Sequence, residues 1–287
     1  MRRAVIDIGT NTVKLLVTEI QNGQLEPVAS KDATTRLGEG TDQTKRLSQG
    51  AINRTVAAIN TYVNAARDLG AAEIVALTTS AARDAANGKE FLEAVRKTCN
   101  LEVEVISGDR EAELIFRGAS SDPAWANQRL LVMDVGGGSA EFIQGKAGTI
   151  ERYQSLPLGA VRLTERFADA GFAEMATFLR QTLHGGLKDY HAGTWKMIGT
   201  GGTITTLARM KRGQTDHATL SLDELRVQVT SLDAMTVDER KQVPELPPDR
   251  ADIIVAGGAV FLFAMEVLGA LELTVSVRNL RYGALLG

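Results

Sequence analysis

Short apolar segments that alternate with polar or glycine-rich turns dominate the first part of the chain. Within residues 4–17, two apolar stretches flank the small residues GTNT and predict a β-hairpin. Residues 48–70 have apolar positions at helical spacing, with Ser48 as the candidate N-cap. Residues 72–88 and 101–119 each predict a strand followed by a helix. This alternation of strands and helices is typical of an α/β fold.

The design of the opening hairpin returns later in the chain. RLLVMDVGGGSAEFIQGKAG, residues 129–148, matches RRAVIDIGTNTVKLLVTEIQNG, residues 2–23, in its order of features. Each stretch has a basic residue, an apolar strand, an aspartate, a turn with glycine and a hydroxyl residue, and a second strand. Asp134 corresponds to Asp7 in this comparison. The repeat indicates an internal duplication, in which each copy opens its own domain.

The domain boundary is placed in a polar segment between the two copies. Residues 120–128 contain a proline and show no periodicity, and the length of 287 residues suits two domains. We therefore expect an N-terminal domain at residues 1–122 and a second domain at 123–287. The C-terminal helix, at about residues 279–287, is a candidate for packing back on the first domain.

The residues in the paired turns are suited to binding an anion. A turn that only reverses the chain needs residues such as Asn-Gly, whereas an anion site needs free N–H groups, hydroxyls and small side chains. The first turn alone fits a plain hairpin equally well, and its repetition favours the anion site. A third glycine-rich turn precedes a helix within residues 195–210 and gives a weaker signal. The candidate phosphate-binding residues of the turns are Gly9, Thr10, Asn11, Thr12, Gly136, Gly137, Gly138, Ser139 and Gly201.

Composition and charge exclude several classes of function. The net charge of −3 argues against a broad basic face for nucleic acid, and no apolar run is long enough to span a membrane. The single cysteine, Cys99, is interpreted as a small buried residue, and a reducing cytoplasm is the expected compartment. The three histidines lack metal-ligand spacing and are interpreted as surface or loop residues. Carboxylates, hydroxyls and backbone amides must therefore carry any chemistry.

Several motifs, taken in order, resemble one known family. The turns DIGTNT and DVGGGS resemble the phosphate-binding hairpins of the actin-like ATPase, sugar kinase and Hsp70 superfamily. Within it, the chain is similar to the exopolyphosphatase and guanosine pentaphosphate phosphatase (Ppx/GppA) family. The motifs that carry this second likeness include TTSAARDAANG, ISGDREAELIF, SLPLGAVRLTERF, GTGGTITTLA and RADIIVAGG. The resemblance implies an α/β fold with two actin-like (ribonuclease H-like) domains, whose mixed sheets face a central cleft.

The resemblance also assigns roles to individual residues. Glu111 matches the catalytic glutamate of the family, although its position in the first turn of a helix alone favours an acid that complements the helix dipole. Arg83 matches the arginine that grips the substrate. From their own chemistry, Asp7 and Asp134 are candidate ligands of Mg²⁺, or of Mn²⁺. Glu141 is a candidate for positioning water or metal, and an acid on the face of a strand is the alternative.

The chain departs from the family pattern close to the candidate base. Arg110 and Glu113 carry charges opposite to those usual in the family. We interpret them as an exchange of surface charges, with Glu113 pairing to Arg117 at the i, i+4 spacing.

These observations predict an enzyme that hydrolyses the terminal phosphoanhydride of inorganic polyphosphate with a glutamate-activated water. Short chains are expected to be preferred, because the sequence has no long cluster of Lys and Arg. A guanosine pentaphosphate 5′-phosphohydrolase is the alternative. A non-hydrolysing sensor of a phosphate ligand and an ATP-dependent kinase are further alternatives. The sequence leaves the oligomeric state open, a homodimer included.

Overall fold

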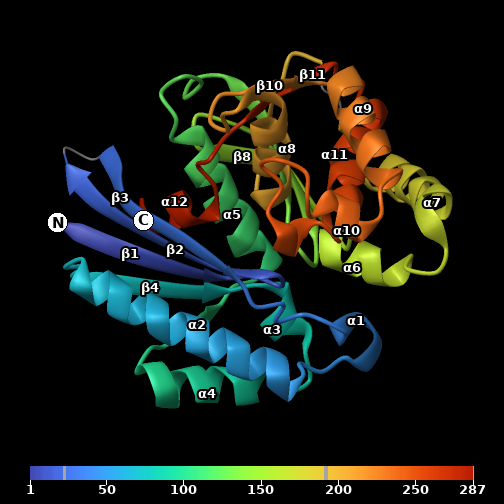
Figure 1. Ribbon diagram of the computed structural model, residues 1–287. Coiled ribbons are helices and arrows are strands. Elements are labelled where there is room, and N and C mark those ends of the chain that lie inside the picture. The colour runs from blue at the N-terminus through green and yellow to red at the C-terminus, as the bar shows by residue number, and fades with distance from the viewer. Residues whose placement is uncertain (22–23, 191–192, 287) are drawn as a thin grey trace. The chain divides into compact units, whose positions relative to one another are not determined.

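In each half of the chain, three consecutive antiparallel strands are followed by a fourth strand that pairs in parallel with the first of them. The computed structural model describes residues 1–21, 24–190 and 193–286. It contains two compact units, each with its own mixed sheet (Figure 1). Unit 1 consists of Met1–Gly118 and Leu280–Gly287, and unit 2 consists of Ala119–Asn279. The division after Gly118 falls shortly before the polar segment in which the sequence placed the boundary.

The sheet of unit 1 has the strand order β3-β2-β1-β4-β5. β1 pairs with β2 antiparallel and with β4 parallel, as expected for a hairpin followed by a crossover connection. β5 contains only two residues, so the strand expected from residue 101 onward is much shorter than its alternating pattern suggests. The strands are β1 (Arg2–Ile8), β2 (Thr12–Gln21), β3 (Gln24–Thr34), β4 (Glu73–Thr78) and β5 (Glu104–Val105).

The long helix of unit 1 begins and ends as the sequence predicts. The Ser48 hydroxyl accepts a hydrogen bond from the Ala51 N–H and caps α2, and Gly70 adopts a positive φ after its last turn. The buried face of α2 and the apolar face of α4 lie in one core with β1 and β2. The helices are α1 (Thr41–Thr44), α2 (Gln49–Asp68), α3 (Ser80–Asp84), α4 (Gly88–Cys99), α5 (Gly108–Ser120) and α12 (Leu280–Leu285).

The C-terminal helix α12 packs on α5 within unit 1. A Cβ at Gly283 would lie 1.9 Å from the Leu114 carbonyl oxygen, so only glycine permits this close approach. The Arg3 guanidinium donates to the Leu285 carbonyl, 2.8 Å away, and fastens the end of α12 to β1. Cys99, at the end of α4, is buried as predicted, and burial raises the pKa of its thiol.

The sheet of unit 2 repeats this plan and extends it by one strand. The order is β10-β11-β9-β6-β7-β8, with β6 antiparallel to β7 and parallel to β9. The strands are β6 (Arg129–Val135), β7 (Ala140–Lys146), β8 (Thr149–Leu156), β9 (Lys196–Thr200), β10 (Thr219–Ser221) and β11 (Glu272–Val275).

One almost fully buried helix, α11, organises the core of unit 2. Its apolar side chains contact α6, α7, α8 and α9, as the nearly continuous apolar sequence predicts. The helix begins at Ile254, and the preceding residues Pro248–Arg250 form a separate 3₁₀ turn. The helices are α6 (Ala160–Arg166), α7 (Gly171–Gly186), α8 (Gly202–Arg212), α9 (Leu222–Asp233), α10 (Val237–Arg240) and α11 (Ile254–Leu268).

Candidate active site

The turn between β1 and β2, which we call turn 1 (residues 9–11), is supported from behind by the segment after β3. The Gly38 N–H donates to the Thr10 carbonyl over 2.9 Å, and the N–H groups of Thr35 and Arg36 donate to the Asn11 carbonyl. In a trans peptide the N–H points away from the preceding carbonyl. The Asn11 N–H therefore points away from this supporting segment. That orientation is the one required of a backbone donor for an anion.

A chain of polar contacts leads from turn 1 to the candidate base. The hydroxyls of Thr10 and Ser80 lie 3.0 Å apart and both residues are buried. Ser80 begins α3, which also carries Arg83. The Arg83 guanidinium lies 3.5 Å from a Glu111 carboxylate oxygen and donates to the Ile106 carbonyl. The structure thus brings together three of the residues that the sequence singled out, Thr10, Arg83 and Glu111.

Glu111 and its neighbour Glu113 have different environments on α5. The side chain of Glu111 is 10% exposed, and its charge is compensated by Arg83. Glu113 lies on the surface between Arg110 and Arg117, as predicted, and hydrogen bonds led by that from Arg110 lower the pKa of its carboxyl. Because Glu111 is buried beside a cation, its environment differs from that of a surface acid that complements the helix dipole.

Turn 2 (residues 136–139), between β6 and β7, has the same kind of support as turn 1. The Ala160 N–H donates to the Gly136 carbonyl over 2.9 Å, and the Val161 N–H donates to the Gly137 carbonyl over 3.0 Å. The Arg162 guanidinium donates to the Gly138 carbonyl. Because these carbonyls are engaged by the start of α6, the N–H groups that follow them point to the opposite side. Both turns therefore present backbone N–H groups on the side away from their supporting segment.

Gly159, just before α6, is expected to be essential for the position of turn 2. A Cβ at this residue would lie 2.2 Å from the Gly137 carbonyl oxygen, which belongs to rigid backbone. Gly159→Ala should lower the free energy of unfolding by about 1–3 kcal/mol, the usual cost of overpacking, and should also reduce activity. The matched control is Gly185→Ala inside α7, where an added Cβ has no heavy atom within 4 Å. Equal melting temperatures of the two variants would contradict this account of turn 2.

Two carboxylates lie beside turn 2 on neighbouring strands. Asp134 and Glu141 are directly paired across β6 and β7, so their side chains lie on the same face of the sheet. Glu141 is 2% exposed and accepts a hydrogen bond of 2.9 Å from Ser155. The Thr200 hydroxyl donates to one oxygen of Asp134. In unit 1 the residue paired with Asp7 is Lys14, so only unit 2 has this carboxylate pair.

The third glycine turn lies next to Asp134 within unit 2. Gly201 has a φ of +93°, and a Cβ there would lie 3.1 Å from the Asp134 Oδ1 atom. Glycine thus keeps the approach to this oxygen open. The following Gly202 begins α8 and lies against the guanidinium of the buried Arg250. The sequence did not predict the contact of Arg250 with this turn.

Ser80, Ser155 and Thr200 were missing from the sequence-based site. Each is a hydroxyl residue whose partner is far away in the sequence, respectively Thr10, Glu141 and Asp134. For Thr200 one signal was available. Thr78 and Thr200 are the last residues of the equivalent strands β4 and β9, which lie next to the two hairpins.

A separate group of potential metal ligands lies in unit 2 at Asp122, Asp216 and His217. Their ligand atoms lie within 4.8 Å of one another. Asp122 is already engaged, because its carboxylate lies 2.8 Å from His217 Nε2 and accepts the Ala124 N–H. Hydrogen bonding accounts for this cluster. His217 thus has a structural role, His184 is exposed, and His191 lies outside the described residues.

Asp122 is expected to make stability depend on pH. Burial acts to raise the pKa of its carboxyl, but the hydrogen bonds from His217 and Ala124 and the charges of His217 and Arg278 outweigh it and lower the pKa. The stabilisation is therefore present above the unfolded pKa, about 3.9, and is lost as the pH falls through the lower folded value. Asp122→Asn should cost about 1–3 kcal/mol at pH 7 and progressively less towards pH 3. Urea unfolding at pH 7 and at lower pH measures this cost and its decrease. A cost independent of pH would contradict the lowered pKa of Asp122.

None of the helices in the described part of the chain is long and apolar enough to cross a membrane. The compartment stays a prediction, and the oligomeric state stays open.

Comparison with known proteins supplies the family. The model of the Ppx/GppA phosphatase family matches residues 16–287. Exopolyphosphatase 1 of Mycobacterium tuberculosis is 32% identical over 301 residues, which cover 100% of this chain and 88% of the relative. Guanosine-5′-triphosphate,3′-diphosphate pyrophosphatase of Aeromonas hydrophila is 30% identical over 99% of this chain but only 58% of its own length.

Solved structures agree with this assignment. An exopolyphosphatase from Cytophaga hutchinsonii superimposes with a TM-score of 0.89 at 30% identity, covering 99% of this chain and 96% of that one. A Ppx/GppA protein of Aquifex aeolicus gives a TM-score of 0.83 at 29% identity, covering 100% and 96%. The fold is therefore the predicted actin-like α/β fold with two mixed sheets. The chain belongs to the Ppx/GppA phosphatase family.

Proposed function

We propose that this chain is an exopolyphosphatase that releases orthophosphate from the end of inorganic polyphosphate. The observation that carries the proposal is the Arg83–Glu111 pair, held at 3.5 Å and linked to turn 1 through Ser80 and Thr10. Within unit 1, this arrangement combines a cation that can bind phosphate, a buried carboxylate and a backbone turn. The exopolyphosphatases of M. tuberculosis and C. hutchinsonii, both similar to this chain over nearly its whole length, support the same activity.

The proposed reaction is the attack of water on the terminal phosphorus. Glu111 accepts a proton from the water while the water oxygen forms a bond to phosphorus. The bond from phosphorus to the bridging oxygen breaks at the same time. The products are orthophosphate and a chain shortened by one unit. Arg83 can hold two phosphate oxygens in a forked geometry that lysine lacks. The N–H groups and hydroxyls of the turns stabilise the charge on the transferred phosphoryl group.

We further propose that the chain uses a divalent cation, Mg²⁺ or Mn²⁺, and that Asp7 in unit 1 and Asp134 in unit 2 are the candidate ligands. The donor atoms are the hard oxygens that these ions prefer. The glycine at position 201 next to Asp134 Oδ1 is consistent with a ligand approaching this oxygen. When bound, the ion would neutralise charge on the phosphate oxygens. Glu141, buried and held by Ser155, is proposed to orient water in the same region of unit 2.

Short polyphosphate chains are the proposed preferred substrates. The turns and Arg83 can bind a few phosphates, whereas a long polymer would need a basic track, and the chain has a net charge of −3. Guanosine pentaphosphate is the second candidate substrate, supported by the A. hydrophila relative. A non-hydrolysing sensor would have no use for a buried carboxylate at the position of Glu111.

The proposal is tested by measuring phosphate release from polyphosphate, guanosine pentaphosphate and ATP with the purified chain. Release from polyphosphate is expected. A chain that binds polyphosphate without releasing phosphate would instead be a sensor, and dependence on ATP with a second phosphoryl acceptor would indicate a kinase.

A further inference from the structure

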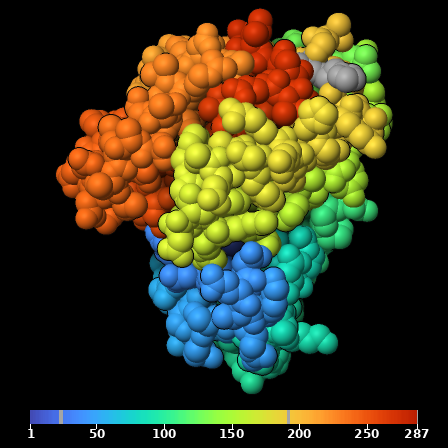
Figure 2. Space-filling view, turned by 90° about the vertical axis from the view of Figure 1, so that its right-hand side faces the viewer, coloured from blue at the N-terminus to red at the C-terminus, as the bar shows by residue number. Residues whose placement is uncertain are grey.

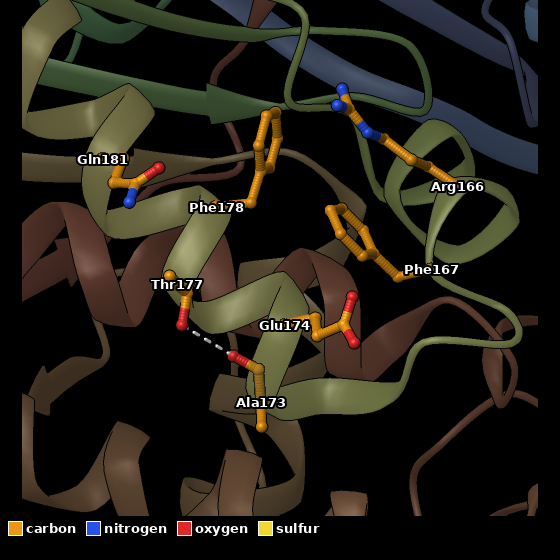
Figure 3. A pocket seen from close by; sticks show the side chains of 7 residues that line it. All are labelled: Arg166, Phe167, Ala173, Glu174, Thr177, Phe178 and Gln181. Atoms are coloured by element: carbon orange, nitrogen blue, oxygen red, sulfur yellow. Dashed lines mark hydrogen bonds between the residues drawn. The ribbon is translucent and has the colours of Figure 1, made fainter.

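A pocket between the end of α6 and one face of α7 lies in unit 2, apart from the residues assigned to hydrolysis (Figure 3). The rings of Phe167 and Phe178 have centroids 5.4 Å apart, and the Arg166 guanidinium lies 4.1 Å from the centroid of the Phe178 ring. Residues of α7, yellow-green in Figure 2, lie on the visible surface of unit 2. Packing of the three side chains on one another accounts for this arrangement, and it indicates no particular ligand.

In unit 1, by contrast, a side chain without an assigned role contacts the segment that supports turn 1 from behind. This supporting segment comprises residues 35–39. Arg54, on α2, donates from Nε to the Thr35 carbonyl over 3.2 Å and from Nη2 to the Glu39 carboxylate over 3.0 Å. Arg54 therefore contacts both the first and the last residue of the supporting segment.

The backbone of the supporting segment has a conformation that needs such contacts. Arg36 has a φ of +53°, in the left-handed region that residues other than glycine rarely adopt. A residue is kept there only when its surroundings fix it. Leu37 is fully buried in the core of unit 1, and the Glu39 N–H donates to the Arg36 carbonyl over 3.1 Å. Arg54 adds a contact on each side of Arg36.

The supporting segment fixes turn 1 through backbone hydrogen bonds. The Asn11 carbonyl accepts from the N–H groups of Thr35 and Arg36, over 3.0 and 2.9 Å. The Thr10 carbonyl accepts from Gly38, and a Cβ at Gly38 would lie 2.3 Å from Thr10 Cγ2. The segment and the turn therefore lie in close contact. A shift of the segment would move Thr10 and Asn11 with it.

We propose that Arg54 is a positioning residue for hydrolysis: it holds the supporting segment, and the segment holds turn 1 with its N–H groups directed at phosphate. The inference rests on the proposed function and adds a residue that acts through turn 1 rather than on the substrate itself. A guanidinium suits this role because its fixed fork of donors can bond a carbonyl and a carboxylate together. Turn 2 has a comparable support, since the Arg162 guanidinium donates to the Gly138 carbonyl over 2.9 Å.

An isolated surface ion pair is a poorer account of Arg54. The side chains of Arg54 and Glu39 are 50% and 54% exposed, and exposed pairs of this kind contribute little to stability. The other hydrogen bond of Arg54 goes to the carbonyl of Thr35, whose own N–H donates to turn 1. Loss of Arg54 should therefore affect the position of turn 1 more than the stability of the fold.

The first test is amide hydrogen exchange of the ligand-free chain. Arg54→Ala should speed the exchange of the N–H groups that the supporting segment donates to turn 1 at least about tenfold, because these groups exchange when the segment opens locally. The matched control is Arg96→Ala on α4, which removes an arginine that is 53% exposed and pairs with Glu93 of its own helix. The control should leave the exchange of these groups unchanged.

The second test is steady-state kinetics with triphosphate. Arg54→Ala should raise KM about tenfold and leave kcat within about threefold, because turn 1 holds phosphate in the bound substrate as well as in the transition state. A role in stability alone has a different signature, since unfolded protein lowers the apparent kcat and leaves KM unchanged. Arg96→Ala should have the kinetic constants of the unaltered chain.

Three results would overturn the proposal: unchanged amide exchange in Arg54→Ala, an unchanged KM in Arg54→Ala, or equal changes in Arg96→Ala. Thermal melts establish that each variant is folded. The exchange measurement needs no substrate, so it tests the hold of Arg54 on the supporting segment even if the unaltered chain releases no phosphate from polyphosphate. Failure of the proposed function is therefore distinguishable from failure of this inference.

Discussion

Replacing Glu111 by glutamine is expected to reduce phosphate release from polyphosphate at least ~10²-fold, the scale of a lost general base. The amide has the shape of the carboxylate but cannot accept the proton of the attacking water. Because Arg83 and turn 1 remain in place, the affinity for polyphosphate should change little. Steady-state kinetics measure the first effect, and a binding titration with polyphosphate measures the second.

The matched control for this experiment is Glu113→Gln on the same helix. Glu113 is tied to Arg110 and Arg117 at the surface, and its change should leave activity within a few-fold of the unaltered chain. A Glu111→Gln protein that retains activity within the same few-fold range would remove Glu111 from the mechanism. Equal losses in both variants would indicate damage to α5 rather than loss of the base.

Chelation of divalent cations with EDTA is expected to abolish hydrolysis, and adding back Mg²⁺ or Mn²⁺ should restore it. Asp134→Ala removes a hard oxygen ligand, so this variant should need a higher metal concentration for half-maximal activity. Asp7→Ala, in unit 1, should likewise raise the metal concentration needed for half-maximal activity. The measurement is the dependence of the initial rate on the metal concentration.

The second group of potential ligands provides the control for the metal assignment. Asp216 belongs to the cluster with Asp122 and His217, and it is 44% exposed. Asp216→Asn should leave the metal requirement unchanged if Asp7 and Asp134 are the ligands. Full activity in EDTA would contradict metal dependence, and a higher metal requirement in Asp216→Asn alone would move the site to that cluster.

Local sequence signals predicted much of the fold and of the two turns. The β1/β2 and β6/β7 hairpins follow from apolar runs interrupted by small residues. Asp7 and Asp134 each lie one residue pair before the turn end of their hairpin. Ser48 marked the start of α2 because N-capping depends on nearby residues alone.

Contacts between distant segments could not be predicted in this way. The Thr10–Ser80 pair and the Arg83–Glu111 pair depend on how β4, α3 and α5 are arranged. The segment between α8 and α11 gave no clear pattern, although it forms β10, α9 and α10. Local capping boxes at Ser221 and Thr236 define those two helices and were a signal that the sequence did contain.

The proposed preference for polyphosphate depends on the phosphate-binding residues and on the similarity to exopolyphosphatases.

The most direct test of the account is a comparison of kcat/KM for triphosphate, long-chain polyphosphate and guanosine pentaphosphate, with Glu111→Gln assayed in parallel to exclude a contaminating phosphatase. The account predicts that a polyphosphate is the best substrate, that short chains exceed long ones, and that Glu111→Gln loses activity on all three. A kcat/KM for guanosine pentaphosphate tenfold above that of every polyphosphate, about 1.4 kcal/mol of transition-state preference, would contradict it.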